Sequence, residues 1–237
     1  TTYLDERNIP VRKVPHLLEA PIQHYKMHFF SEYFEQWDWI VYVDLDMWFT
    51  NKIDLKFQTR DKTKLYAKKD GLSFMSQFYG ADDDAQIMGK FKKELTHPQN
   101  VYRDKLYIKY GDSIALQTCF MVWHTSMNKE KFRELQNTYF FVYEWLHLAR
   151  ANHWDQAIFN IVFHNKWGIL TKCVQSTAVD NHTWDIEELQ KGYYDDGNYE
   201  VATCVHQTEF FPPWEKFNKR FYPAWNKYYI QALKCEI

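Results

Sequence analysis

Apolar runs separated by polar segments indicate a chain in which strands alternate with helices. Ile40–Val43 is a short β-branched and aromatic run and Ala115–Trp123 is a longer one, so both predict strands buried on both faces. Gln23–Gln36, Ser126–Ala151 and Asp155–Phe163 instead repeat large apolar residues at helical spacing, which predicts amphipathic helices. This alternation indicates an α/β protein with a mainly parallel central sheet flanked by helices.

Shorter patterns add elements around this frame. Strands are predicted at Ile9–Val14, Lys64–Ala67, Ile169–Val174 and Glu200–Val205, and Thr1–Arg7 resembles the end of a helix. We find no internal repeat, low-complexity tract or linker, so residues 1–237 are predicted to form a single domain. Its last segment, 215–237, is aromatic and basic. That segment predicts a helix packed on the domain, with acceptor binding or contact with an anionic membrane surface as the alternatives.

Composition narrows the class of partner. The chain has 237 residues, a formal net charge of −2 and 19% aromatic residues. A nearly neutral chain has no basic field with which to hold nucleic acid, so nucleic-acid partners are not expected. Abundant aromatic rings without positive charge fit stacking on sugar rings, although a heavy aromatic core would explain the same composition.

The cellular compartment stays open. Cys119, Cys173, Cys204 and Cys235 are widely spaced, which disfavours a zinc site and allows either two disulfides or four free thiols. One sequon, Asn181-His182-Thr183, is compatible with a secretory lumen. No apolar run approaches the roughly 20 residues that span a bilayer. The chain begins without Met, as a piece of a longer protein would. The location is therefore left unknown: a soluble domain is expected, either cytoplasmic or in the Golgi lumen if a missing N-terminal portion carries an anchor.

The run Ile40–Val43 leads into two aspartates, Asp44 and Asp46, spaced i and i+2. Ligands of open α/β sheets bind at the C-terminal ends of the strands, where both carboxylates would lie. Two hard oxygen ligands at that edge suit Mg²⁺ or Mn²⁺ carrying a phosphate-bearing substrate. Such a triplet alone is more often a solvated turn, and its position after a buried run is what favours a metal site.

Two further constellations carry polar chemistry. Asp155 and Gln156 open the amphipathic helix that also holds Asn160; together a carboxylate and an amide can recognise the hydroxyls of a sugar. A plain helix cap would explain Asp155 equally well. His206 follows a predicted strand and precedes Pro212-Pro213-Trp214, so its imidazole could complete a metal shell begun by two carboxylates.

These features, in this order, resemble glycosyltransferase family 8, the glycogenin-like and bacterial galactosyltransferase-like enzymes with the Rossmann-like GT-A fold. The family's strand and Asp-x-Asp motif are similar to Tyr42–Asp46, and its Asp-Gln motif is similar to Asp155–Phe163. Its C-terminal motif of His, Pro and Trp is similar to His206–Trp214. A basic residue one helix before the Asp-x-Asp resembles Lys26, and a polar residue that opens the middle strand resembles Gln117.

The resemblance implies transfer of a sugar from a nucleotide diphosphate donor, with a UDP-sugar favoured, to a saccharide or glycoconjugate acceptor. It implies that Asp44, Asp46 and His206 hold Mn²⁺ or Mg²⁺ and that Asp155 and Gln156 are catalytic. The donor-binding residues that it implies are Lys26, Asp44, Leu45, Gln117, Asp155, Gln156 and Trp214, while the acceptor-binding residues stay unknown. The family retains the anomeric configuration; inversion would need a carboxylate base, for which Glu209 and Asp155 are the candidates.

The chain departs from the family pattern in its C-terminal motif. The family's lysine that touches the diphosphate is Pro212 here, and its glycine is Glu209. Lys216 or Lys219 would have to replace the missing charge. The family's first strand, which holds the nucleotide base, is not found before Thr1.

Two other classes of function compete with this interpretation. A nucleotidyltransferase also places carboxylates and Mg²⁺ at a parallel strand edge, but it would usually carry a glycine-rich phosphate loop. A non-catalytic carbohydrate-binding module would use the aromatic rings without a metal shell. Metal-dependent binding of a nucleoside diphosphate separates the enzyme from the binding module.

Overall fold

The computed structural model describes residues 22–45, 47–49, 55, 59–73, 97–110, 113–145, 154–171, 173–177 and 204–208. Several predictions fall outside these residues: the two elements before residue 15, Asp46, Trp214, and the segment 215–237. Backbone alone is described for β7, the strand that contains His206.

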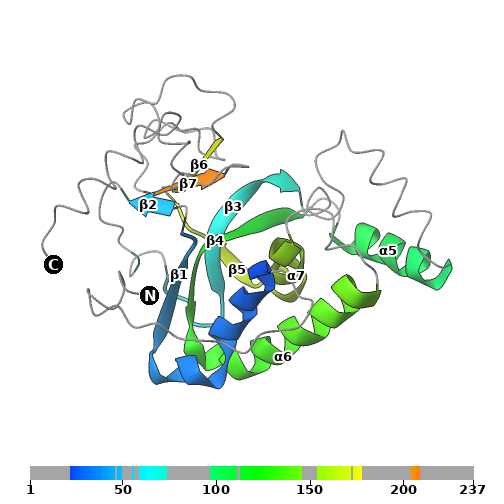
Figure 1. Ribbon diagram of the computed structural model, residues 1–237, viewed down its shortest axis with the longest axis horizontal. Helices are drawn as coiled ribbons and strands as arrows, with labels where there is room; N and C mark the ends of the chain where they lie inside the picture. Colours follow the sequence, from blue (N-terminus) through cyan, green and yellow to red (C-terminus); the bar gives the residue numbers. More distant parts are fainter. Residues whose placement is uncertain are drawn as a thin grey trace, which may run out of the picture.

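The main sheet has four strands. Their order is β1 (Trp39–Val43), β4 (Ile114–His124), β3 (Leu65–Ser73) and β5 (Trp167–Ile169) (Figure 1). β4 is antiparallel to both of its neighbours, and β3 is parallel to β5. β1, β3 and β5 therefore run in one direction, and β4 runs against them. The fold is α/β as predicted, but the sheet is mixed because its reversed strand lies in the middle.

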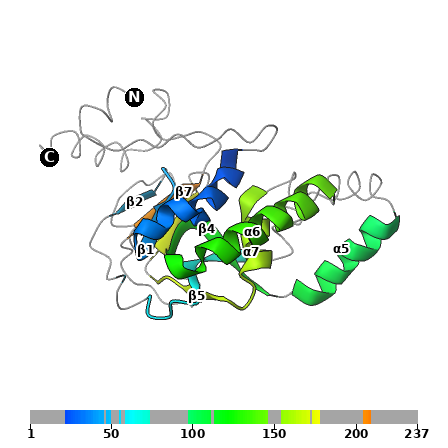
Figure 2. The ribbon, with the colours of Figure 1, turned by 90° about the horizontal axis from the view of Figure 1, so that it is seen from below.

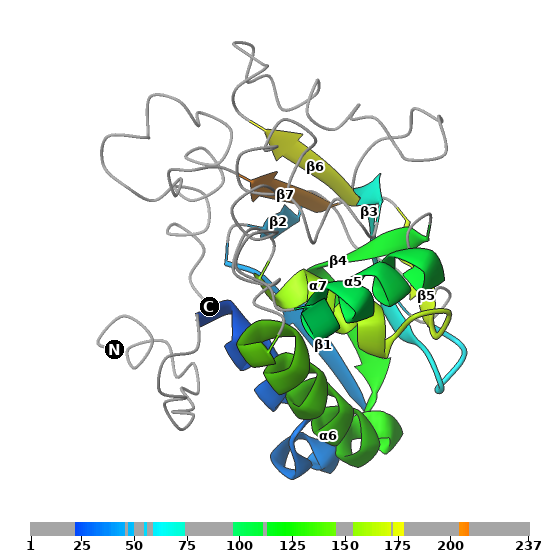
Figure 3. The same ribbon diagram turned by 90° about the vertical axis from the view of Figure 1, so that its right-hand side faces the viewer.

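A smaller sheet has the order β2 (Met47–Phe49), β7 (Cys204–Thr208) and β6 (Cys173–Thr177). It lies at the opposite end of the main sheet from helix α6 (Asn128–Tyr139), as Figures 1 and 3 show from two directions. The strand predicted at Ile169–Val174 is in fact divided between β5 and β6, one in each sheet. Buried Leu170 follows β5, where the chain passes from one sheet to the other.

Helices cover one face of the main sheet. α6 packs on α7 (Trp154–Val162) and on η1 (Ile22–Phe30), and α7 packs on β4 (Figure 2). The remaining helical elements are η2 (Glu32–Gln36), α5 (His97–Tyr110), η3 (Thr125–Met127) and η4 (Phe140–Trp145). The helix predicted at Gln23–Gln36 is two 3₁₀ segments joined at Ser31, and the long helix predicted after Ser126 changes from 3₁₀ to α to π. Across the described residues, every helix is too short or too polar to span a bilayer.

The core has one cluster on each face of the sheet. On the helix side, Phe30 stacks on Trp123 with ring centroids 4.3 Å apart, and both rings are fully buried. On the other side, Tyr66 and Phe120 pack with Met47 of the smaller sheet. β4 is buried on both faces, as its apolar run predicted. β1 is not buried on both faces, although its apolar run predicted that it would be. It lies at the edge of the sheet, where β4 is its only partner among the described strands, and its Val41 is 47% exposed.

A register shift shapes the edge where the polar residues lie. Ala67 pairs with Met121, but the next residue, Lys68, pairs with Gln117. The β4 segment between these two partners is therefore out of register with β3. The carbonyl of Cys119, within that segment, accepts a hydrogen bond of 2.8 Å from the backbone N–H of Asp44. This bond ties the end of β1 to the irregular part of β4.

Candidate active site

Asp44 lies directly after the last residue of β1, as predicted. Its carboxylate accepts a hydrogen bond from the hydroxyl of Tyr42, and its backbone is held by β4 as described above. The next residue, Leu45, leaves the sheet and is 88% exposed. Strand β2 begins at Met47, whose backbone N–H donates to the carbonyl of Asp44 at 3.2 Å; Asp46, the second aspartate of the motif, lies outside the described residues.

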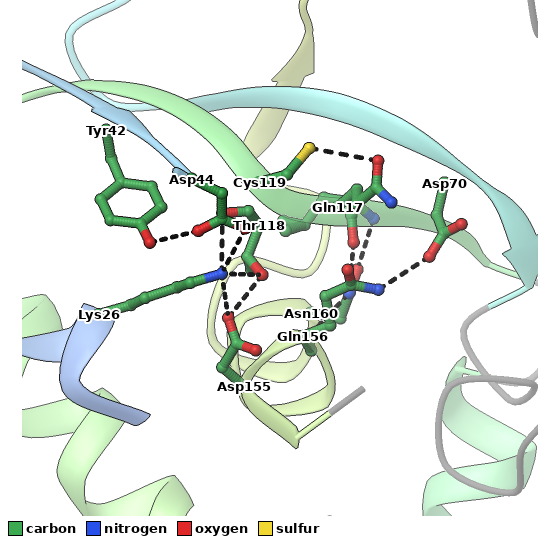
Figure 4. Close-up of polar contacts among 11 residues, drawn as sticks. Lys26, Tyr42, Asp44, Asp70, Gln117, Thr118, Cys119, Asp155, Gln156 and Asn160 are labelled. Atoms are coloured by element: carbon green, nitrogen blue, oxygen red, sulfur yellow. Dashed lines mark hydrogen bonds and ion pairs between the residues drawn. The ribbon is translucent and has the colours of Figure 1, made fainter. Parts of the chain in front are cut away.

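Lys26 joins two motifs that are far apart in the sequence. Its ammonium, carried on η1, lies 3.1 Å from a carboxylate oxygen of Asp44 and 3.1 Å from one of Asp155 (Figure 4). It also donates to the hydroxyl of Thr118 at 3.3 Å and lies 5.3 Å from the centre of the Tyr42 ring. The side chains of Lys26, Asp44 and Asp155 are only 11%, 22% and 8% exposed, so this is a largely buried cluster.

The charges of this cluster are unequal. Burial alone would lower the pKa of the Lys26 ammonium, but the carboxylates of Asp155 and Asp44 outweigh burial and raise it above 10.5. Burial raises the pKa of the Asp44 carboxyl above 3.8, against the opposing effect of Lys26. With both carboxylates ionised, one ammonium faces two negative charges. The cluster is thus suited to accept further positive charge.

Asp155 and Gln156 lie in the first turn of α7 and point toward the sheet edge. The hydroxyl of Thr118 donates to Asp155 at 2.5 Å, so this carboxylate contacts β4 and η1. The amide nitrogen of Gln156 donates to Asp70 of β3 at 2.9 Å. Because an ionised carboxylate can only accept, this bond fixes which end of the Gln156 amide is nitrogen. Its amide oxygen is therefore directed away from Asp70.

Asn160 anchors α7 to the sheet. Its amide oxygen accepts from the backbone N–H of Leu116 at 2.7 Å, and its amide nitrogen donates to the carbonyl of Leu116 at 2.9 Å. Asn160 is 3% exposed. This part of the predicted motif therefore acts in structure, by holding the helix that carries Asp155 and Gln156.

Gln117 lies on β4 beside Thr118 and is 4% exposed. Its amide oxygen accepts from the thiol of Cys119 at 3.3 Å, so Gln117 and Cys119 share one face of the strand. Thr118 points to the other face, where Lys26 and Asp155 lie (Figure 4). The thiol of Cys119 is buried, with the residue 1% exposed.

Backbone pairing brings the third motif to the same edge. β2 pairs antiparallel with β7, and His206 is the Cα partner of Met47. His206 therefore lies opposite the residue that follows Asp46, although 160 positions separate that histidine from the aspartate. Among the side chains that the structure describes, no group of three His, Cys, Asp or Glu could hold a metal. Asp46 and the side chain of His206 are not among them.

The structure adds three polar residues that the sequence did not single out. Thr118 binds both Lys26 and Asp155, Asp70 orients Gln156, and Lys68 is buried beside Gln117 in the strand register. Lys68 and Asp70 belong to a charged run at the end of a short predicted strand, and such runs usually face solvent. Their position after a strand was the one available signal.

No protein-family model and no curated protein matches this sequence. Solved structures match its fold. The galactosyltransferase LgtC, in complex with donor and acceptor sugar analogs, superposes with a TM-score of 0.53 at 12% identity, over 99% of this chain and 74% of LgtC. An active-site mutant of LgtC superposes with a TM-score of 0.52 at 14% identity, over 92% of this chain and 69% of the mutant. The bifunctional glycosyltransferase WbbM superposes with a TM-score of 0.47 at 18% identity. This match covers 86% of this chain and about a third of WbbM (34%). The likeness to LgtC shows that the chain has a GT-A-like glycosyltransferase fold.

Proposed function

We propose that this protein is a metal-dependent glycosyltransferase of family 8. It moves a sugar from a nucleotide diphosphate sugar, with a UDP-sugar favoured, to a hydroxyl of a saccharide or glycoconjugate. One observation carries the proposal: Lys26 joins Asp44, at the end of β1, to Asp155, at the start of α7. Two motifs selected independently in the sequence thereby meet at the sheet edge where ligands of such folds bind.

The donor set fits Mn²⁺ or Mg²⁺. Asp44 and Asp46 would supply carboxylate oxygens and His206 an imidazole nitrogen, and the pairing of β2 with β7 supports their convergence. A bound divalent cation would act as a Lewis acid on the diphosphate leaving group. The excess negative charge around Lys26 supports this assignment, since a second cation would balance it.

The residues of the chain would divide the work of binding and orientation. Lys26 holds Asp44 and Asp155 in place and adds positive charge near the donor phosphates. Asp155 would accept hydrogen bonds from sugar hydroxyls, and Gln156 would present its amide oxygen to the reacting sugar, since Asp70 holds its nitrogen. Leu45, Gln117 and Trp214 would complete the donor site.

We infer retention of configuration. A retaining transfer can pass the proton of the acceptor hydroxyl to the departing phosphate oxygen, so no separate base is required. Asp155 is engaged by both Lys26 and Thr118, which favours a role in orientation over a role as a free base. The anomeric configuration of the product, read by NMR, tests this inference. An inverted product would contradict it.

The first experiment is isothermal titration with UDP, with and without Mn²⁺. We expect binding that requires Mn²⁺ and weakens about 100-fold or more in Asp44→Asn, which removes one charged metal ligand. Asp61→Asn is the matched control, because Asp61 lies in an exposed turn and bonds to Thr63. A UDP affinity that is the same with and without Mn²⁺ and is unchanged in Asp44→Asn would contradict the proposal. If UDP binds as expected, a panel of UDP-sugars identifies the donor by turnover.

A further inference from the structure

Lys68 is a second buried lysine at this sheet edge, and no carboxylate of a described residue pairs with it. The residue is 5% exposed, and its ammonium donates to the backbone carbonyl of Lys69 at 2.9 Å. Lys68 forms no ion pair within the described part of the chain. An ammonium has three donors, so a single neutral acceptor leaves most of its hydrogen-bonding capacity unused.

Burial of an unpaired charge is costly, which makes Lys68 informative. Charged side chains in protein interiors are normally paired, because each ion loses several kcal/mol of hydration when it leaves water. Asp70 lies two residues along β3, but its carboxylate is used by Gln156. Lys68 therefore keeps a free-energy cost in the unliganded protein that an incoming anion would relieve.

The strand register places Lys68 at the candidate active site. Lys68 and Gln117 are Cα partners, so their side chains share one face of the sheet. That face also carries Cys119 and packs against Met47, the residue opposite His206. Asp44 lies two strands away across β4, a separation of about 10 Å. A donor held at Asp44 is long enough to cover this distance with its diphosphate and sugar.

We propose that Lys68 binds an anionic group of the nucleotide-sugar donor, either its diphosphate or a carboxylate on the transferred sugar. The proposal rests on the proposed glycosyltransferase function. It also accounts for the departure at Pro212, where the resembling family has a lysine that touches the diphosphate. Lys68 supplies from strand β3 the positive charge that the C-terminal motif lacks.

The test compares wild type with Lys68→Met by isothermal titration in the presence of Mn²⁺. The probes are inorganic pyrophosphate, UDP, UDP-glucose and UDP-glucuronic acid. Lys64→Met is the matched control, since Lys64 precedes the same strand and pairs at the surface with Asp61. If circular dichroism shows that Lys68→Met does not fold, Lys68→Gln takes its place, because glutamine removes the charge and keeps a hydrogen-bond donor. Lys68→Arg should restore part of the affinity.

We expect Lys68→Met to lose roughly 10- to 100-fold in affinity, as for a hydrogen bond to a charged group. A loss for pyrophosphate and UDP identifies the diphosphate as the ligand. A loss confined to UDP-glucuronic acid identifies the sugar carboxylate. Equal affinities of wild type and Lys68→Met for all four probes would overturn the proposal. Wild type that binds pyrophosphate through Lys68 but no nucleotide would overturn the proposed function, and with it the nucleotide-sugar as ligand, while the anion site at Lys68 would stand; wild type that binds no probe would overturn both.

Discussion

Lys26 and Lys68 are buried lysines at one edge of the same sheet, but their surroundings differ. Lys26 lies between the carboxylates of Asp44 and Asp155, whereas Lys68 has one backbone carbonyl. A third buried lysine, Lys131, follows the first pattern, since it pairs with Glu134 at 2.6 Å. The paired lysines are satisfied by the protein itself. The difference indicates that Lys26 organises the site, while Lys68 is available to a ligand.

Lys26→Met should have the largest effect on stability. The change would leave Asp44 and Asp155 buried without their shared cation, which should lower the free energy of unfolding by about 3–5 kcal/mol. Urea denaturation followed by tryptophan fluorescence measures it. A loss below about 1 kcal/mol would show that the cluster is hydrated and that the contrast with Lys68 is smaller than we infer.

Asp70→Leu should have the next largest effect. The change leaves the buried amide nitrogen of Gln156 without its acceptor, at a cost of about 2 kcal/mol. In the active enzyme it should also lower kcat more than it raises KM, because the amide oxygen is no longer oriented. Asp70→Asn still offers an oxygen to the amide of Gln156, so it should retain much of the stability and much of kcat. If Asp70→Asn and Asp70→Leu lose the same stability and activity, Asp70 acts through its charge, and its hydrogen bond to Gln156 is incidental.

The pH dependence of stability tests the pairing of Lys26 in the intact protein. Because its pKa is raised, the stabilisation from Lys26 is complete below 10.5, the pKa of an ordinary lysine, and is lost as the pH rises through the folded-state value. Denaturation between about pH 9 and about pH 11.5 should therefore cost wild type more stability than it costs Lys26→Met. Parallel curves for the two proteins would contradict a raised pKa.

Lys68→Met should have the smallest effect on stability, without the large loss expected for Lys26→Met. Replacing an unpaired buried charge with an apolar side chain of similar length should leave stability within about 1 kcal/mol of wild type or raise it. Thermal unfolding of the unliganded protein measures this. A loss as large as that of Lys26→Met would show that the bond to Lys69 satisfies Lys68 and that its charge is not reserved for a ligand.

The sequence predicted the parts of this protein that depend on local pattern. The apolar run of Ala115–Trp123 is β4, the helical spacing after Asp155 is α7, and Asp44 follows a strand as expected. Each prediction used neighbours within a few residues, and burial on both faces of β4 matched its continuous apolar character. The prediction that Ile40–Val43 is buried on both faces was wrong, because the burial of an apolar strand depends on what packs around it, and Val41 is exposed.

Other features depended on partners far along the chain. The split between β5 and β6 was not visible in residues 169–174, because both halves favour a strand and only the two sheets distinguish them. Charged residues such as Lys68 and Asp70 usually face solvent, and their burial follows from pairing with β4. Thr118 carries no signal in the sequence, since a threonine in a strand is ordinary and its role arises from α7 and η1.

The sequence by itself determined the class of the fold, the order of its main elements and the three motifs in which polar chemistry is concentrated. These follow from hydrophobic periodicity and from residue types suited to metal and sugar chemistry, which are local properties. The tertiary structure decided that Lys26 lies between Asp44 and Asp155, that Asp70 orients Gln156, and that Lys68 is buried without an ion pair to any described residue. Charges interact through space, so their partners and their hydration are known only when distant segments have packed together.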